Sequence, residues 1–335
     1  MCLSWKTPSH CLASAVLLLT VVACGGGEPG APASAPAVPE PAPVAAEEAR
    51  AASMPGRGST ASRVDGLEIA WEAVGAGPAT LVFIHGWQCD RSFWREQVAH
   101  FADDYRLVLV DLPGHGESAG GREDWSMAAF GEDVAAVVGE VVSGPVVLIG
   151  HSMGGPVILE AASGIEGLVG LVAVDTLREV LAPPPDEAEL TAAMAPVEAD
   201  YAGVVQNFIA SMFVESTPPA LRAEILATMT AGDREAGIGM MRGYARMDYA
   251  PAFARLAVPL VIFNSDYRPT PAEAIRERYP TLLFETIEGV GHFPMLEAPQ
   301  RFNTRLEEIL DSLFGGLTAA AAGRQTAVET AAQER

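Results

Sequence analysis

Short apolar runs rich in β-branched residues alternate along this chain with longer amphipathic stretches. The runs are Thr80–Ile84, Leu107–Val110, Val146–Ile149, Leu168–Val174, Leu260–Phe263 and Leu282–Ile287. Buried parallel strands have this length and composition, and they need crossover connections that are usually helical. Arg63–Val74, with a turn signal at Asp65 and Gly66, is typical of an opening hairpin. We therefore expect an α/β fold with a mostly parallel eight-stranded sheet and helices on both faces.

One interval interrupts this alternation. Residues Thr176–Ala257, about eighty in number, are rich in Ala, Met, Glu and Pro and contain no clear strand. This composition predicts a helical cap inserted over one end of the sheet.

The amino terminus has the layout of a secretory signal peptide over residues 1–23. Lys6 supplies the positive charge, and the apolar stretch Cys11–Ala23 is too short to span a membrane as a helix. Val21–Cys24 resembles a bacterial lipobox, which implies that Cys24 is acylated and anchors the protein to a membrane. Ordinary secretion is the alternative. The prediction is an exported, lipid-anchored protein of the bacterial cell envelope, on the outer-membrane or periplasmic side.

Composition sets the other boundaries. Residues 24–59 are rich in Ala, Pro and Gly and should form a disordered linker, and residues 318–335 should form a disordered tail. The folded domain is expected over residues 60–317, with its cap over about 176–257. Three of the four cysteines lie in the first two dozen residues, so the domain holds only Cys89 and no disulfide framework.

Charge and motif spacing exclude several classes of function. The formal net charge is -22, and no run of Lys or Arg could neutralise a phosphate backbone, so nucleic acid is not an expected partner. No HExxH or paired CxxC spacing occurs, so we predict neither a metal site nor a cofactor. The oligomeric state stays open.

The sharpest motif is Gly150–Gly154 (GHSMG), which follows the strand VVLI and precedes a helix. This GxSxG pattern is typical of a nucleophile elbow, a tight turn whose flanking glycines leave room for neighbouring backbone. The turn exposes a strained serine at the carboxyl edge of the sheet. Ser152 is therefore the predicted nucleophile.

A serine hydroxyl needs a base to remove its proton. His292 follows the last predicted strand and lies far downstream of Ser152, which suits a base that arrives from another part of the chain. The other histidines lie in the signal peptide, on a probable helix, or in glycine turns ahead of or beside the serine: His10, His100, His85, His115 and His151. We predict His292 as the general base.

Four motifs in order resemble the α/β-hydrolase superfamily across about Val64–Phe314. They are HGW at His85–Trp87, DLPGHGES at Asp111–Ser118, GHSMGG at Gly150–Gly155 and GVGHF at Gly289–Phe293. The resemblance implies an oxyanion hole formed by the backbone N–H groups of Met153 and Trp87. It also implies an acid after the strand that follows the cap, which makes Asp266 the preferred residue. Asp175, at the end of Leu168–Val174, is the alternative that some members of the superfamily use.

Together these residues predict a serine hydrolase that cleaves small or medium carboxylic esters through an acyl-enzyme on Ser152. One alternative is a proline iminopeptidase-like aminopeptidase that binds a substrate amine through cap carboxylates. The candidates for that role are Asp186, Glu187, Glu189, Glu198, Asp200 and Glu215. A second alternative is a noncatalytic binding protein on the same fold. Cys89 has no histidine of its own and is expected to be a buried, idle thiol.

Overall fold

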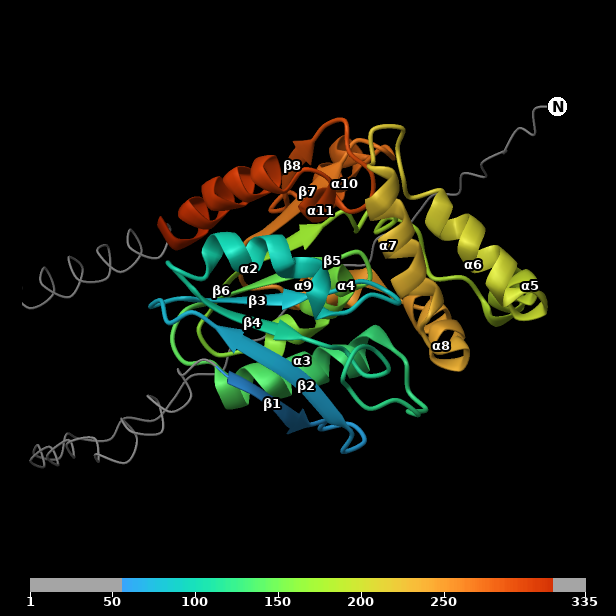
Figure 1. Cartoon of the computed structure of the whole chain (residues 1–335), viewed down its shortest axis with the longest axis horizontal. Coiled ribbons are helices and arrows are strands. Elements are labelled where there is room, and N and C mark those ends of the chain that lie inside the picture. The colour runs from blue at the N-terminus through green and yellow to red at the C-terminus, as the bar shows by residue number, and fades with distance from the viewer. Residues whose placement is uncertain (1–55, 316–335) are drawn as a thin grey trace, which may run out of the picture. The chain divides into compact units, whose positions relative to one another are not determined.

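The computed structural model describes residues 56–315, which form one eight-stranded sheet (Figure 1). Its strands follow the spatial order β1-β2-β4-β3-β5-β6-β7-β8. Only the pairs β1–β2 and β2–β4 are antiparallel, and all the others are parallel. The strands are β1 Gly56–Ala61, β2 Glu68–Val74, β3 Thr80–Ile84, β4 Arg106–Val110, β5 Val146–His151, β6 Leu168–Val174, β7 Leu260–Ser265 and β8 Leu283–Ile287. The predicted fold class is thereby confirmed.

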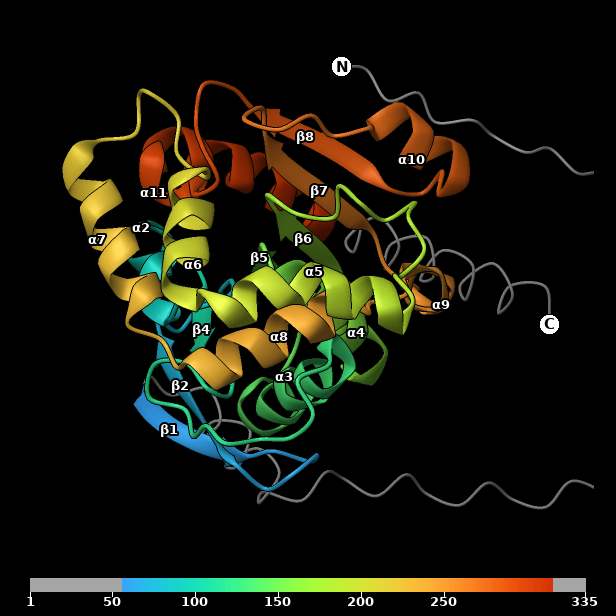
Figure 2. The same cartoon turned by 90° about the vertical axis from the view of Figure 1, so that its right-hand side faces the viewer.

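The helices cover both faces and one edge of this sheet (Figures 1 and 2). They are α2 Arg95–Phe101, α3 Met127–Val141, α4 Gly154–Ala161, α5 Glu187–Ala199, α6 Tyr201–Ala210, α7 Pro219–Thr230, α8 Arg234–Ala245, α9 Tyr249–Arg255, α10 Ala272–Arg278, α11 Pro294–Glu297 and a carboxyl-terminal helix over residues 299–315, with short 3-10 turns at Arg91–Trp94 and Ala162–Gly164. On one face, α2 joins the carboxyl-terminal helix through a 2.8 Å hydrogen bond from Gln97 to Asn303. On the other face, α3 packs against α4.

The centre of the sheet forms the core because its strands are apolar on both sides. Every residue of β3, β4 and β5 is buried. This complete burial explains why these strands are visible in the sequence as continuous apolar runs rather than as alternating ones. Their carboxyl ends all point toward the same edge, where the functional loops emerge.

The opening hairpin differs from its prediction. The first strand begins at Gly56 rather than Arg63, so the expected linker, set to end at Ser59, extends four residues too far. Its sequence has little apolar content, and backbone pairing with β2 stabilises it instead, with Gly58 opposite Trp71. A side chain at Gly58 would lie 2.6 Å from the Trp71 ring, so the absence of one allows the indole to cover this strand.

The predicted insertion is helical, and helices α5 to α8 form the cap over the carboxyl edge of the sheet (Figure 2). The last helix of the interval, α9, packs with the main domain instead. Its Arg255 forms a 2.8 Å ion pair with Glu160 of α4, and its Phe253 ring contacts Tyr279 after α10.

Several predictions lie outside the described residues: the signal peptide, the acylation of Cys24, most of the linker and the tail over residues 318–335. Between residues 56 and 315, no helix combines the length and the apolar character needed to cross a bilayer. The membrane anchor and the location in the cell envelope stay predictions.

Candidate active site

Ser152 lies in the sharp turn between β5 and α4. Its φ is 51°, in the left-handed region that a non-glycine residue rarely adopts. A Cβ at Gly150 would lie 2.2 Å from the carbonyl oxygen of Gly154, and one at Gly154 would lie 2.6 Å from that of Ile84. Only glycine fits at these two positions, so the motif builds the turn that the sequence predicted and leaves Ser152 half-buried at the sheet edge.

His292 is held by its own loop and by the cap. Its backbone N–H donates to the carbonyl of Met212, after α6, at 2.9 Å, and its carbonyl accepts from Nε2 of His151 at 2.8 Å. The carboxylate of Glu297 accepts from the backbone N–H groups of Gly291 and Phe293, the two neighbours of His292 in the chain. The imidazole position is therefore set by three separate parts of the chain.

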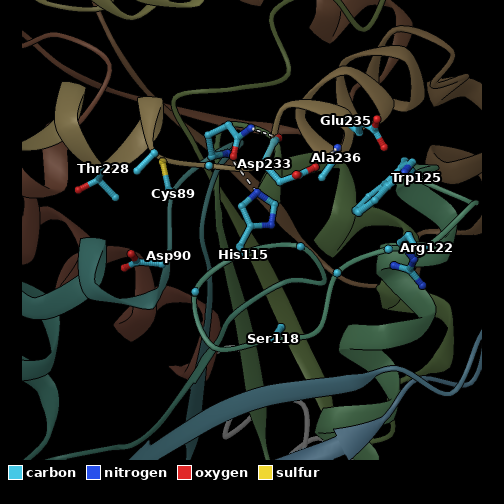
Figure 3. Close-up of a pocket in the computed structure, with 17 residues that line it drawn as sticks. Cys89, Asp90, His115, Ser118, Arg122, Trp125, Thr228, Asp233, Glu235 and Ala236 are labelled. Carbon is cyan, nitrogen blue, oxygen red and sulfur yellow. Dashed lines mark hydrogen bonds between the residues drawn. The ribbon is translucent and has the colours of Figure 1, made fainter.

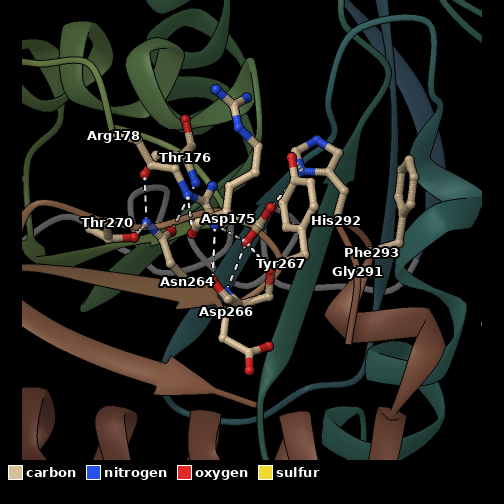
Figure 4. A network of polar contacts seen from close by, with 12 residues as sticks. Asp175, Thr176, Arg178, Asn264, Asp266, Tyr267, Thr270, Gly291, His292 and Phe293 are labelled. Atoms are coloured by element: carbon tan, nitrogen blue, oxygen red, sulfur yellow. Dashed lines mark hydrogen bonds and ion pairs between the residues drawn. The ribbon is translucent and has the colours of Figure 1, made fainter. Parts of the chain in front are cut away.

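The carboxylate that contacts His292 belongs to Asp175. Its Oδ2 accepts from Nδ1 of His292 at 2.5 Å, and its side chain is fully buried at the end of β6 (Figure 4). Because a carboxylate accepts, Nδ1 carries the proton and Nε2 keeps its lone pair for another partner. The alternative acid of the sequence analysis is thus the one beside the imidazole.

The prediction of Asp266 as the acid that contacts His292 is wrong. Strand β7 continues to Ser265, two residues beyond its predicted end, and successive side chains of a strand point to opposite sides. The N–H and hydroxyl of Ser265 donate to Asp175, whereas Asp266 is exposed and points away from the imidazole (Figure 4). Asp266 accepts from the N–H of Gly289, so it supports the loop that leads to His292.

A buried arginine, which the sequence analysis did not single out, forms an ion pair with Asp175. Nη2 of Arg178 donates to Oδ1 of Asp175 at 2.7 Å and to the carbonyl of Ser265. Burial alone would raise the pKa of Asp175, but the hydrogen bond from His292 and the charges of His292 and Arg178 lower that pKa overall. The carboxylate therefore stays ionised. An arginine three residues after a strand-end aspartate was the signal available in the sequence.

Ser152, Asp175 and His292 line one cavity of about 640 Å³ beneath the cap. Apart from them, its lining is mostly apolar: Trp87, Met153, Val197, Val204, Phe208, Met212, Met229, Met240, Met241, Tyr244, Tyr267 and Phe293. Charged side chains are confined to Arg178, Glu179 and Arg268 among the described residues besides the site itself. The cavity suits a mainly apolar molecule that carries a small polar reacting group.

Trp87 and Met153, the expected oxyanion residues, both line this cavity beside Ser152. Gly86 lets their loops approach each other, since a Cβ there would lie 3.1 Å from Cβ of Ser152. The structure thus brings together the predicted nucleophile, base and oxyanion residues, and it replaces the preferred acid by the alternative one.

Three histidines near the site are buried without charge. The ring of His85 accepts from the N–H of Leu112, and that of His115 accepts from the N–H of Gln88. Burial lowers the pKa of both. Burial and the nearby His292 lower the pKa of His151 to about 3. These three neutral rings hydrogen-bond to neighbouring loops, and we assign none of them the role of the general base.

We expect the neutral His151 to make stability depend on pH. In the unfolded chain His151 binds a proton below about pH 6.5, whereas in the folded protein it does so only below about pH 3. The free energy of unfolding therefore falls as pH falls through this window. His151→Gln should reduce that slope by up to about 1.4 kcal/mol per pH unit. Urea denaturation at several pH values measures it. An unchanged slope would show that His151 is charged in the folded protein.

The other candidate groups contribute no reacting atom, although Cys89 lines the same cavity as Ser152. Cys89 is buried and forms no disulfide, and burial raises its pKa well above the ordinary value, which disfavours the reactive thiolate. In the described part of the chain, no group of three or more His, Cys, Asp or Glu side chains could hold a metal ion. Asp186 and Asp200 cap helices, and Glu187 and Glu198 pair with arginines.

Comparisons with known proteins bear on the family and the fold. The model of the alpha/beta hydrolase family matches residues 81–305. A pimeloyl-acyl-carrier-protein methyl ester esterase of Xanthomonas oryzae pv. oryzae is 31% identical over 255 residues, which are 69% of this chain and 97% of that protein. Its counterpart in Edwardsiella ictaluri is 28% identical over 260 residues, 72% of this chain and 96% of that protein.

Among solved structures, a thermophilic esterase from Thermogutta terrifontis with malate bound superposes with a TM-score of 0.67. It is 26% identical in sequence, and the match covers 77% of this chain and 99% of that one.

Proposed function

This chain belongs to the alpha/beta hydrolase family and is esterase-like, and we propose that it cleaves small or medium carboxylic esters through an acyl-enzyme on Ser152. The observation that carries the proposal is the buried Asp175–His292 hydrogen bond at the wall of the cavity that also holds Ser152. A serine in an elbow, an imidazole in the same cavity and a buried carboxylate hydrogen-bonded to that imidazole are the groups that nucleophilic acyl transfer needs. The curated relatives, named as methyl ester esterases, support an ester substrate.

In the first half of the reaction, Oγ of Ser152 forms a bond to the ester carbonyl carbon while Nε2 of His292 takes the hydroxyl proton. Negative charge builds up on the former carbonyl oxygen, and the amides of Trp87 and Met153 donate to it. The carbon–oxygen bond to the alcohol then breaks, and the imidazolium gives its proton to the leaving oxygen. Asp175 stabilises the imidazolium throughout.

In the second half, His292 takes a proton from water as the water oxygen attacks the acyl carbon. The bond to Oγ of Ser152 breaks, the proton returns to that oxygen, and a carboxylic acid leaves. The apolar cavity holds the acyl chain, and each buried methylene adds about 0.8 kcal/mol of binding.

The preference for acyl-chain length should change when a cap residue that lines the cavity is enlarged. Met241 of α8 lines the cavity, so Met241→Trp fills part of it. We expect the kcat/KM for p-nitrophenyl octanoate to fall roughly tenfold, because overpacking costs about 1–3 kcal/mol, while that for the acetate changes little. Leu226→Trp, on α7 outside the cavity lining, is the control. Equal losses for both esters in Met241→Trp would argue against an acyl site here.

The proposal is tested by two measurements on the purified protein. A fluorophosphonate probe should label Ser152, as located by peptide mass spectrometry, and p-nitrophenyl esters of increasing acyl length should be hydrolysed. Absence of labelling in folded protein would favour the noncatalytic alternative. Faster turnover of proline p-nitroanilide than of any ester would favour the aminopeptidase.

The cap gives the aminopeptidase little support. None of the six cap carboxylates proposed for amine binding is among the described residues that line the cavity. Glu179, the one acidic side chain there besides Asp175, pairs with Arg268 at 3.2 Å. A substrate ammonium group would therefore meet two arginines near this end of the cavity, which favours a neutral ester.

A further inference from the structure

Gln88 is the residue directly after Trp87, and the mechanism above gives it no role. It lies in the loop after β3, its φ is 56°, and only 3% of its surface is exposed. A buried non-glycine residue in the left-handed region persists only where its surroundings hold it there. The surroundings of Gln88 therefore control the backbone of the loop that carries the oxyanion donor.

Those surroundings belong largely to the cap. Nε2 of Gln88 donates to the hydroxyl of Tyr201, the first residue of α6, at 2.9 Å. It also donates to the carbonyl of Asp233, which precedes α8, at 3.0 Å. The backbone N–H of Gln88 donates to Nε2 of His115 in the main domain. Gln88 thus joins the oxyanion loop to two cap helices.

Two cap glycines leave space for this side chain. A Cβ at Gly232 would lie 1.8 Å from Oε1 of Gln88. A Cβ at Gly237 would lie 2.4 Å from its Nε2 and 2.1 Å from the Tyr201 hydroxyl. Any larger residue at either place would displace the amide, so the fit between Gln88 and the cap is specific.

Trp87 has cap contacts of its own. Its indole Nε1 donates to the carbonyl of Gly237 at 3.0 Å, and its ring lies edge-on to Phe208 of α6 with centroids 6.1 Å apart.

On another side of the loop is a second cavity of about 730 Å³, bordered by Cys89, His115 and Asp233 (Figure 3). Beside this cavity, hydrogen bonds hold Gln88 in place: its side chain bonds to the cap, and its backbone N–H bonds to His115.

We propose that Gln88 is a positioning residue through which the cap holds the oxyanion loop in its working conformation. The inference rests on the proposed function. A donor stabilises an oxyanion only if it is already in place when charge develops, so loosening the loop weakens transition-state binding more than substrate binding. The cap then completes the catalytic machinery in addition to shaping the substrate cavity.

The test compares Tyr201→Phe, which removes one acceptor, with Gln88→Met, which removes the whole amide at similar volume. We expect kcat for a p-nitrophenyl ester to fall about fivefold and about tenfold respectively, with KM nearly constant. The inhibition constant of phenylboronic acid, which forms a tetrahedral adduct on Ser152, should rise by the same factors. The double variant should be no worse than Gln88→Met alone.

Tyr279→Phe is the matched control, since this ring packs against Phe253 between α9 and α10, and its kinetics should equal those of the wild type. Unchanged kcat and boronate inhibition in Tyr201→Phe would reject the inference, as would a rise in KM alone. If Gln88→Met does not fold, Tyr201→Phe decides the question. Failure of the wild-type protein to react with esters and fluorophosphonate would instead reject the proposed function.

Discussion

Replacing Ser152 with alanine is expected to abolish ester hydrolysis, with a loss in kcat on the order of 10⁶-fold. The variant removes the only atom that forms the acyl bond, whereas the cavity and the Asp175–His292 pair stay in place. Substrate binding should therefore survive, and any residual rate would reflect the oxyanion donors acting on water. The measurement is kcat for a p-nitrophenyl ester, with fluorophosphonate labelling as a second readout.

Ser163→Ala is the control for this experiment, because Ser163 is an exposed serine in the 3-10 turn after α4. It should keep the activity and the labelling of the wild type. Substantial turnover by Ser152→Ala, with a labelled residue elsewhere, would mean that another nucleophile performs the reaction.

Replacing Asp175 with asparagine should lower kcat about 10⁴-fold. The amide would no longer hold the proton on Nδ1 of His292, and it would remove the charge that stabilises the imidazolium. Arg178 would also face a neutral side chain instead of the carboxylate that it now contacts at 2.7 Å. Circular dichroism and thermal melting establish whether the variant is folded.

Asp266→Asn is the matched control, since it makes the same chemical change in an exposed residue that contacts Gly289. A loss of less than about tenfold is expected, because the residue supports the loop of His292 rather than the imidazole itself. The reverse order of effects, with Asp266→Asn the more damaging, would restore the acid that the sequence favoured.

Local patterns predicted the sheet and the elbow because local physics determines them. The apolar runs became β3 to β8 with ends shifted by no more than two residues. Strands β3 to β7 are almost entirely buried and mostly apolar, as strands covered on both faces must be, whereas the edge strand β8 is largely exposed or half-buried, contrary to the expectation of a buried strand. The turn at Ser152 needs glycine on both sides because backbone atoms would otherwise come within 2.2 Å of a Cβ. His292 was identifiable because its glycine-rich loop directly follows the last strand.

Tertiary structure alone decided the acid and the cap contacts. Asp175 and His292 are 117 residues apart in sequence, and two extra residues of β7 pairing determine that Ser265 faces Asp175 while Asp266 faces solvent. Gln88 meets its partners across 113 and 145 residues. The sequence by itself determined the elements and the residue types of the reaction, because these follow from short-range sterics and burial. Only folding decided which distant carboxylate and amide reach the site, because strand register and cap packing set those distances.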